Sequence, residues 1–312
     1  MPPARLGLIY CGCFVTIEAF QAVFLGGVFQ SVSAFMIGAW VFGLSTAACT
    51  AAVVITRPQQ IRAVLTSWRL VAALNGLTAL TWTAYFAALT LVEPAVVFTL
   101  FSGALPLATR LAGAAGMPEA HESPSRGAKA GYGLILLAMA ALCATSAAGF
   151  AGFTRGSAWI ALAGAALAIT SGACTAFVIL YSARLNRRGI GPMAQFGLRY
   201  WVYTLLAIGV VYSGLDPAPA PQAGALAWVV ALGLITIAFP LYLVQKAVPL
   251  VPAPTIAAIT ALGPVLVFAM QAFDGRISFS AATLAGLILY SSGAVLLAGA
   301  ISRTSYRPAS QR

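Results

Sequence analysis

The sequence predicts an all-α polytopic membrane protein with ten transmembrane helices, and two observations carry that prediction. Of the 312 residues, 61% are hydrophobic and only 7% are charged, whereas an ordinary soluble domain has about 25% charged residues. Such a chain cannot cover a soluble core with a charged surface. The apolar segments also run without interruption for about 20 residues, which is the length that a helix needs to cross a bilayer.

Helices rather than barrel strands follow from the pattern within these segments. A strand of a membrane barrel alternates polar and apolar residues over about ten positions, whereas the apolar runs here are continuous. A helix also satisfies its own backbone N–H and C=O groups, which lipid cannot do. We expect the first span to be an uncleaved helix, because Glu18 interrupts its apolar run. The ten expected spans are 6–27, 31–56, 70–91, 94–114, 130–150, 158–181, 193–214, 225–245, 251–273 and 279–301.

The distribution of basic residues predicts the orientation of the chain. With ten spans and a cytoplasmic N-terminus, only Arg155 and Arg276 of the 17 Lys and Arg residues fall on the outer side. Because Lys and Arg concentrate in cytoplasmic loops, we expect both termini to be cytoplasmic and the protein to lie in a bacterial inner membrane. The net charge of +11 is spread over short loops that face anionic lipid, so membrane lipid rather than nucleic acid is the expected partner.

The residue types that usually hold metals or perform catalysis are sparse. The five cysteines are odd in number and all lie in expected spans, and His121 is the only histidine. The loop of His121 offers too few further ligands for a metal, and we find no nucleophile–base–acid arrangement and no phosphate-binding loop. We therefore expect no cofactor, no metal and no enzymatic activity.

Short segments of the first half of the chain recur in the second half. A pair of prolines 12 residues apart occurs twice, at an offset of 158 residues, and a Gly-Leu-Ile-Leu segment recurs at an offset of 153. The matching positions are Pro94 and Pro106 with Pro252 and Pro264, and Gly133–Leu136 with Gly286–Leu289. These echoes divide the chain into repeats of five helices, 1–150 and 151–312.

Because five is odd, the two halves enter the membrane from opposite sides and form an inverted repeat. Many secondary transporters have this architecture and hold their substrate near the midplane between the halves. Pro106 and Pro264 lie inside the fourth and ninth spans, where a proline interrupts the hydrogen-bond ladder and permits a kink. We expect these two positions to allow gating.

Several segments resemble the drug/metabolite transporter superfamily of the EamA type. The resemblance rests on Tyr85-Phe-Ala-Ala-Leu-Thr-Leu-Val-Glu-Pro-Ala95, the Leu105-Pro106 helix, Glu119, a second copy from Tyr242 to Pro264, and the helix Gly286–Gly293. The chain departs from that family in two places, with Cys13-Phe14-Val15 where Trp-Gly often opens the first helix and Asp274-Gly275-Arg276 where Gly-Glu-Arg is typical. The resemblance implies a ten-helix permease, but the family handles too many substrate classes to imply one.

Glu18 and Arg199 are the charged candidates for a substrate site. Glu18 lies near the middle of the first span, where a charge costs about 2.5–3.5 kcal/mol, and Gln21 follows one turn later on the same face. Glu18 either binds a cationic substrate group or a coupling proton, or is a structural carboxylic acid. Arg199 either holds a carboxylate or phosphate or extends to the interface. If both face one cavity they suit a zwitterion such as an amino acid, unless they pair with each other.

Uncharged candidates complete the expected substrate site. Trp82, Tyr85 and Tyr290 lie deep in the helices that carry the repeat, where lining a cavity competes with the usual interfacial role of Trp and Tyr. Asn75 is a buried amide that either contacts substrate or, like Gln245 and Gln271, joins helices.

The sequence favours a secondary transporter, an exporter or permease of a small metabolite such as an amino acid or amine, working by alternating access. Two other classes stay open. An integral-membrane enzyme acting on lipid or polyprenyl substrates would need clustered acidic, His or Arg residues at one membrane face. A non-transporting membrane subunit would not need Glu18 in mid-membrane.

Overall fold

The computed structural model describes residues 2–29, 32–120, 125–153, 156–215, 223–275 and 278–305, and these contain helices and no strand. His121, Arg155, Arg276 and the segment 216–221 lie outside the described residues. In chain order the helices are α1 (Pro3–Val28), α2 (Ala34–Thr56), α3 (Gln59–Thr66), α4 (Trp68–Leu91), α5 (Pro94–Ala114), η1 (Pro118–Ala120), α6 (Arg126–Ala147), α7 (Ala158–Arg187), α8 (Pro192–Leu198), α9 (Trp201–Tyr212), α10 (Ala223–Gly233), η2 (Leu234–Ala238), α11 (Phe239–Ala247), α12 (Ala253–Thr260), α13 (Gly263–Asp274) and α14 (Ala281–Ser305).

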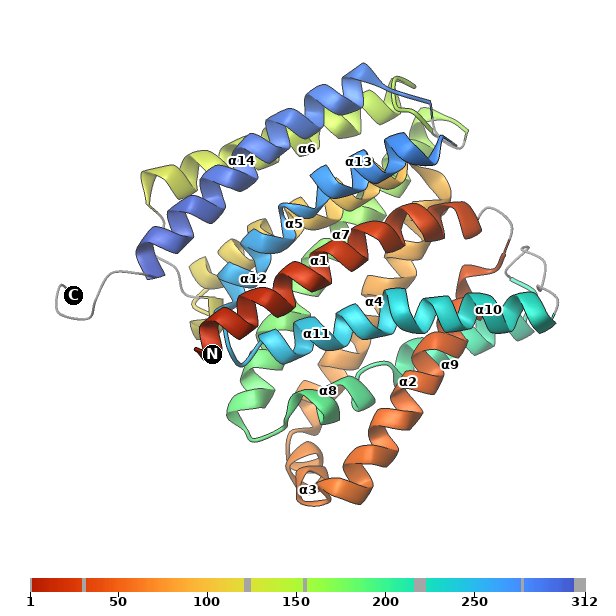
Figure 1. Ribbon diagram of the computed structural model, residues 1–312, viewed down its shortest axis with the longest axis vertical. Coiled ribbons are helices and arrows are strands. Elements are labelled where there is room, and N and C mark those ends of the chain that lie inside the picture. The colour runs from red at the N-terminus through yellow and green to blue at the C-terminus, as the bar shows by residue number, and fades with distance from the viewer. Residues whose placement is uncertain are drawn as a thin grey trace.

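Ten helical segments in the described part are long and apolar enough to cross a membrane, which confirms the all-helical class and the number of expected spans. The chain is by this measure an integral membrane protein. Seven spans are single helices, while the seventh is α8 with α9, the eighth is α10, η2 and α11, and the ninth is α12 with α13. The start of α1 and the end of α14 lie on the same side of the bundle (Figure 1).

The interruptions of the seventh and eighth spans were not expected from the sequence, and those of the eighth and ninth have a local cause at a proline. In the eighth span, η2 is a π-helical turn in which the N–H of Phe239 reaches the carbonyl of Leu234. It lies just before Pro240, which has no N–H to give to a regular helical turn. In the ninth span α12 ends at Thr260, and Pro264 lies in the first turn of α13, where a missing N–H costs nothing.

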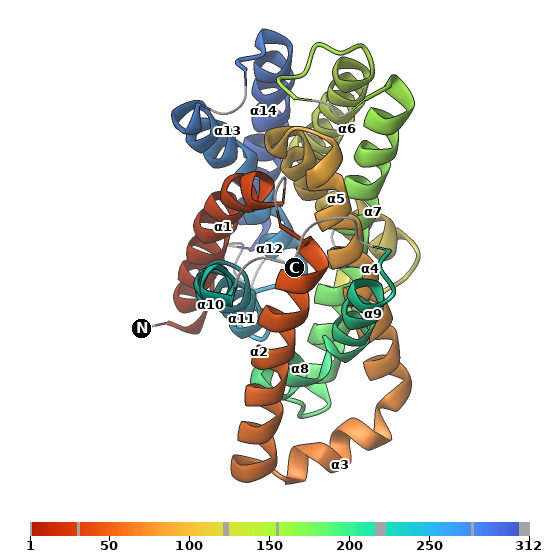
Figure 2. The ribbon, with the colours of Figure 1, turned by 90° about the vertical axis from the view of Figure 1, so that its right-hand side faces the viewer.

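The two prolines predicted to allow gating therefore differ in their position within a helix. Pro264 starts a new helical segment in the middle of its span, while α5 continues through Pro106 without a break. A short helix, α3, which the sequence analysis also missed, joins α2 to α4 and has no buried residue. Figure 2 shows α3 at an extremity of the molecule, beside the end of α2 and beyond α8.

Close helix packing fixes the framework around the centre. The helices α6 and α14 lie side by side at one edge (Figures 1 and 2), and α5 lies in the interior between α7 and α13. A Cβ atom on Gly172 of α7 would lie 2.0 Å from the carbonyl oxygen of Phe101 on α5. Only glycine allows these two helices to approach so closely, which is the usual role of small residues between membrane helices.

Candidate functional site

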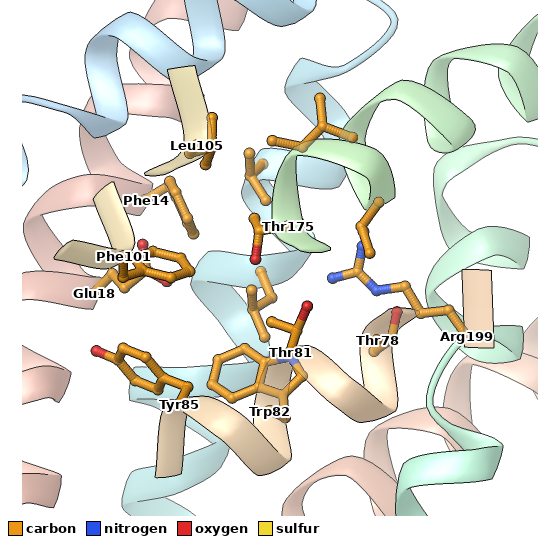
Figure 3. A pocket seen from close by; sticks show the side chains of 14 residues that line it. Phe14, Glu18, Thr78, Thr81, Trp82, Tyr85, Phe101, Leu105, Thr175 and Arg199 are labelled. Atoms are coloured by element: carbon orange, nitrogen blue, oxygen red, sulfur yellow. The ribbon is translucent and has the colours of Figure 1, made fainter. Parts of the chain in front are cut away.

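A cavity in the interior of the bundle brings together four of the residues singled out in the sequence. Glu18, Trp82, Tyr85 and Arg199 all line it (Figure 3). The other lining residues come from α1, α4, α5, α7 and α11: Phe14, Thr78, Thr81, Phe101, Leu105, Thr175, Val178, Ile179, Leu241 and Val244. About 40 Å³ is free to the centres of water-sized spheres, which is room for about three water molecules. A metabolite can enter only if the surrounding helices separate.

Glu18 is the acidic group of this cavity. The residue is only 3% exposed, and its Oε2 atom has no hydrogen-bond partner among the described residues. A buried polar atom without a partner is costly, and native proteins leave few of them. The carboxyl group of Glu18 is therefore available to a group that the described residues do not supply.

Arg199 lies across the cavity from Glu18 in Figure 3, and the two side chains make no ion pair. Arg199 is 4% exposed, so its side chain is buried between helices. Its Nη1 atom donates to Gln245 Oε1 at 2.9 Å, its Nη2 atom donates to the Tyr200 hydroxyl, and the guanidinium lies 4.7 Å from the Tyr200 ring centroid. Its Nε atom has no partner in the described part of the chain.

A chain of amides holds the guanidinium in place from behind. Gln245 donates through Nε2 to Gln195 Oε1 at 2.7 Å, and Gln195 donates in turn to the carbonyl of Ile190 at 2.7 Å. Gln245 thus joins α11 to α8, as the sequence analysis expected of a buried amide. Because both glutamines of this hydrogen-bonded series have partners, Arg199 keeps one orientation toward the cavity.

The α4 side of the cavity is a polar and aromatic stripe. Thr78, Thr81, Trp82 and Tyr85 follow one another at the helical spacing i, i+3, i+4 and i+7, so they share one face. The hydroxyl groups of Thr78, Thr81 and Tyr85 are buried and have no partner among the described residues. The sequence analysis identified the two aromatics and missed the two threonines, although this spacing is visible in the sequence.

Aromatic rings enclose the part of the cavity near Glu18. The Tyr85 ring lies 5.8 Å from Trp82 and 5.3 Å from Phe101, centroid to centroid. Phe14 comes from the same helix as Glu18, one turn earlier. Rings of this kind attract a cation to their faces, so they favour the same charge as the carboxyl group does.

The other expected site residues do not line this cavity. Gln21 is buried in α1, and its Nε2 atom has no partner in the described ranges. Tyr290 of α14 packs against α5, where a Cβ atom on Gly103 would lie 3.0 Å from its ring. Asn75 donates to the carbonyl of Leu198 at 2.6 Å and accepts from the N–H of Val202 at 3.3 Å. Asn75 therefore joins α4 to the break between α8 and α9, beside Arg199.

A second buried carboxyl group, Glu93, lies in the connection between α4 and α5 and has several partners. Its Oε1 atom accepts from Gln271 Nε2 at 2.5 Å, and its Oε2 atom accepts from the Gly152 N–H at 2.7 Å and from Thr283 Oγ1 at 3.2 Å. Burial raises the pKa of the Glu93 carboxyl above its ordinary value, and these hydrogen bonds oppose part of that rise. This cluster ties the start of α5 to α13, α14 and the segment before α7.

A charged cluster lies beyond the other end of α5. Glu119 in η1 accepts from Arg184 at 3.0 and 2.9 Å and also pairs with Arg187, both at the end of α7. The Glu119 side chain is 3% exposed, while those of Arg184 and Arg187 are 33% and 59% exposed. Each end of α5 is thus fastened by one buried carboxylate, and the cavity lies between them.

Comparison with known proteins supports the fold alone. No protein-family model and no curated protein matches the sequence. One solved structure, described only as "Crystal structure of protein", is 20% identical, with 98% of each chain covered and a TM-score of 0.66. A likeness at this identity shows that the two chains share a fold and indicates no activity.

Proposed function

We propose that the protein is a secondary transporter that moves a small metabolite with a cationic amino group, such as an amino acid or amine, by alternating access. It acts in this proposal as an exporter or permease of the bacterial inner membrane, with both termini cytoplasmic. One observation carries the proposal: Glu18 lines an interior cavity together with Arg199, and one of its carboxyl oxygens has no partner among the described residues.

The chemistry of the cavity supports an amino group at Glu18. An ammonium group donates to the carboxylate and is attracted by the faces of the surrounding rings. When no substrate is bound, a proton can take the same place, so Glu18 is also our candidate for proton coupling. Thr78, Thr81 and the Tyr85 hydroxyl supply further hydrogen-bonding groups without partners among the described residues.

Arg199 makes an amino acid the better of the two substrate types. Its guanidinium is buried, carries a fixed charge and makes no ion pair with any described residue. Two of its nitrogens are held by Gln245 and Tyr200, which leaves Nε for a carboxylate. A zwitterion with an apolar side chain matches both charges and the aromatic wall, whereas a simple amine uses Glu18 alone.

The neighbours of each helix support two inverted repeats, 1–150 and 151–312. The first span, α1, packs against α11 and α13 of the eighth and ninth spans. The sixth span, α7, packs in the same way against α4 and α5, the third and fourth spans. Exchange of neighbours between halves is what a two-fold axis in the membrane plane produces, and with the sequence segments described above it favours the EamA-type drug/metabolite transporters.

The hydrogen bonds and ion pairs at the two ends of α5 support alternating access. The Glu93 cluster joins helices at one end of α5 and the Glu119 ion pairs join them at the other, on either side of the lining residues Phe101 and Leu105. Transport requires each to open in turn while the other holds. The break at Pro264 and the proline at Pro106 are the positions where we expect the ninth and fourth spans to bend.

Counterflow in proteoliposomes tests the proposal. Vesicles loaded with one unlabelled compound from a panel of amino acids, amines, nucleosides and sugar phosphates are diluted into the labelled compound. We expect uptake of an amino acid or amine with wild type and none with Glu18→Gln. Glu122→Gln makes the same chemical change in the segment between the fourth and fifth spans and should keep wild-type uptake. Uptake that Glu18→Gln leaves intact would refute the proposal.

A further inference from the structure

A basic pocket lies away from the central cavity, where α3 meets α4 and the end of α7. Its walls are Thr66, Ser67, Trp68, Arg69, Leu70 and Arg188, and about 470 Å³ is free to the centres of water-sized spheres. Nothing in the proposed transport cycle uses this pocket. Unlike the central cavity, it lies at the surface.

The two arginines of this pocket are exposed, and each makes one contact with a residue of the pocket wall. Arg188 Nη1 donates to Ser67 Oγ at 3.3 Å, and the Arg69 guanidinium lies 5.5 Å from the centroid of the Trp68 ring. Neither makes an ion pair within the described ranges, where Glu119 pairs with Arg184 and Arg187. Two positive charges therefore face one pocket without an anion from the described chain.

The segments that form the pocket are held together by a further contact. The N–H of Gly191, just after α7, donates to Gln60 Oε1 of α3 at 3.1 Å. Ser67 is 5% exposed and ends α3 where α4 begins. The pocket thus lies at a junction where α3, α4 and the segment after α7 contact one another.

Exposed apolar side chains accompany this positive pocket. Trp68, one of its walls, is 62% exposed, and Leu65, which directly precedes the wall residue Thr66, is 68% exposed. Tryptophan and arginine together at the end of a span are typical of the lipid headgroup level. A short helix with exposed leucine and arginine matches the amphipathic segments that lie in the interface. A free phosphate ion would gain nothing from these apolar groups, whereas acyl chains would cover them.

We infer that the pocket binds the phosphate of an anionic phospholipid, with Arg69 and Arg188 on the phosphate and the acyl chains along Leu65 and Trp68. Positive charge next to a membrane attracts anionic lipid in this way. Both arginines lie on the side that the distribution of Lys and Arg assigns to the cytoplasm. Bound lipid would join α3 and α4 to the end of α7, which lie in different proposed repeats.

Native mass spectrometry of the delipidated full-length protein tests this inference. The protein is titrated with dioleoylphosphatidylglycerol, dioleoylphosphatidylcholine or inorganic phosphate. We expect one phosphatidylglycerol to bind tightly to wild type, and Arg69→Gln with Arg188→Gln to weaken it about 30-fold. The control, Arg126→Gln with Lys129→Gln, removes two exposed charges from the start of α6 and should keep the affinity within about twofold of wild type.

Three results would overturn the inference. Equal weakening in both double variants would mean that net charge alone attracts the lipid. Equal binding of phosphatidylcholine would mean that the site does not select the anionic headgroup. Displacement of the lipid by millimolar inorganic phosphate would make this a site for a soluble anion. The Lys versions, Arg69→Lys with Arg188→Lys, keep the charge and should retain most of the affinity, which separates lost binding from lost folding.

Discussion

Glu18 and Glu93 are both buried glutamates, and the difference between their surroundings separates a candidate binding site from a structural cluster. Glu93 is fully buried and accepts three hydrogen bonds, from Gln271, Gly152 and Thr283. Glu18 is nearly as buried, yet its Oε2 atom has no partner among the described residues. The described residues supply hydrogen-bond partners to both oxygens of Glu93, and they supply none to Oε2 of Glu18.

This difference suggests separate roles for the two groups. The Glu93 cluster contributes to stability, whereas the surroundings of Glu18 can contribute to ligand binding. Donors arranged around Glu93 hold α5, α13 and α14 in one position, so a change there should affect folding first. The cavity around Glu18 offers an acid, aromatic faces and hydroxyls without a complete internal network. A change there should affect binding first, because few contacts within the protein are lost.

The largest expected effect is on transport in Glu18→Gln. The amide keeps the shape of the side chain but removes its negative charge and its ability to carry a proton. We expect transport to fall at least ~100-fold, corresponding to ~2.7 kcal/mol, while the melting temperature stays close to that of wild type. Initial rates in proteoliposomes and melting in detergent measure the two quantities. A variant that transports normally would remove Glu18 from the mechanism.

The next effect is on stability, in Glu93→Ala. This change leaves the Gly152 N–H, the Gln271 amide and the Thr283 hydroxyl without their acceptor, and unsatisfied buried donors are costly. We expect a loss of about 2 kcal/mol in the free energy of unfolding, measured by thermal melting of the purified protein. Thr175→Val, a change in the cavity wall, is the control and should melt nearly as wild type does. Equal melting of Glu93→Ala and wild type would show that the cluster is not structural.

A smaller loss is expected in Asn75→Ala. Asn75 bonds to Leu198 and Val202 on either side of the break between α8 and α9. We expect the alanine variant to lose about 1 kcal/mol of stability and to transport less, because the break also positions Arg199. Uptake and melting that both match wild type would mean that the break holds without Asn75.

The smallest effect is the dependence of stability on pH that comes from Glu93. Burial raises the pKa of this carboxyl in the folded protein, so the folded state holds the proton more tightly than the unfolded state does. Stability from this group should therefore be present at low pH and fall as pH rises from the ordinary Glu value through the raised one. Melting temperatures across that range should show the fall in wild type and a flatter profile in Glu93→Gln.

Composition and periodicity were sufficient to predict the helical class and the ten spans, because lipid imposes length and apolarity on each one. The break near Arg199 was missed, since it depends on contacts with another helix. Asn75 illustrates this: its partners Leu198 and Val202 are more than 120 residues away along the chain.

The cavity was predictable only in part. Glu18 was evident because a charge in mid-membrane is rare, and Arg199 because an arginine inside a span is rare too. That both line one cavity depends on how α1 and the break after α8 pack together, which no spacing in the sequence records. Gln21 and Tyr290 looked equally suitable from their positions in the spans, yet they do not line it. The spacing of residues in a sequence shows on which face of its helix a side chain lies. It does not show which other helix packs against that face.

The measurement that tests the central claim most directly is thermal stabilisation of the purified protein by a panel of metabolites. A ligand present at 100 times its dissociation constant adds ~2.7 kcal/mol to stability. We predict that an amino acid or amine raises the melting temperature of wild type and of Glu122→Gln, but not that of Glu18→Gln. If that ligand stabilises Glu18→Gln as much as wild type, the open carboxyl group of Glu18 is not its binding site and the account is wrong.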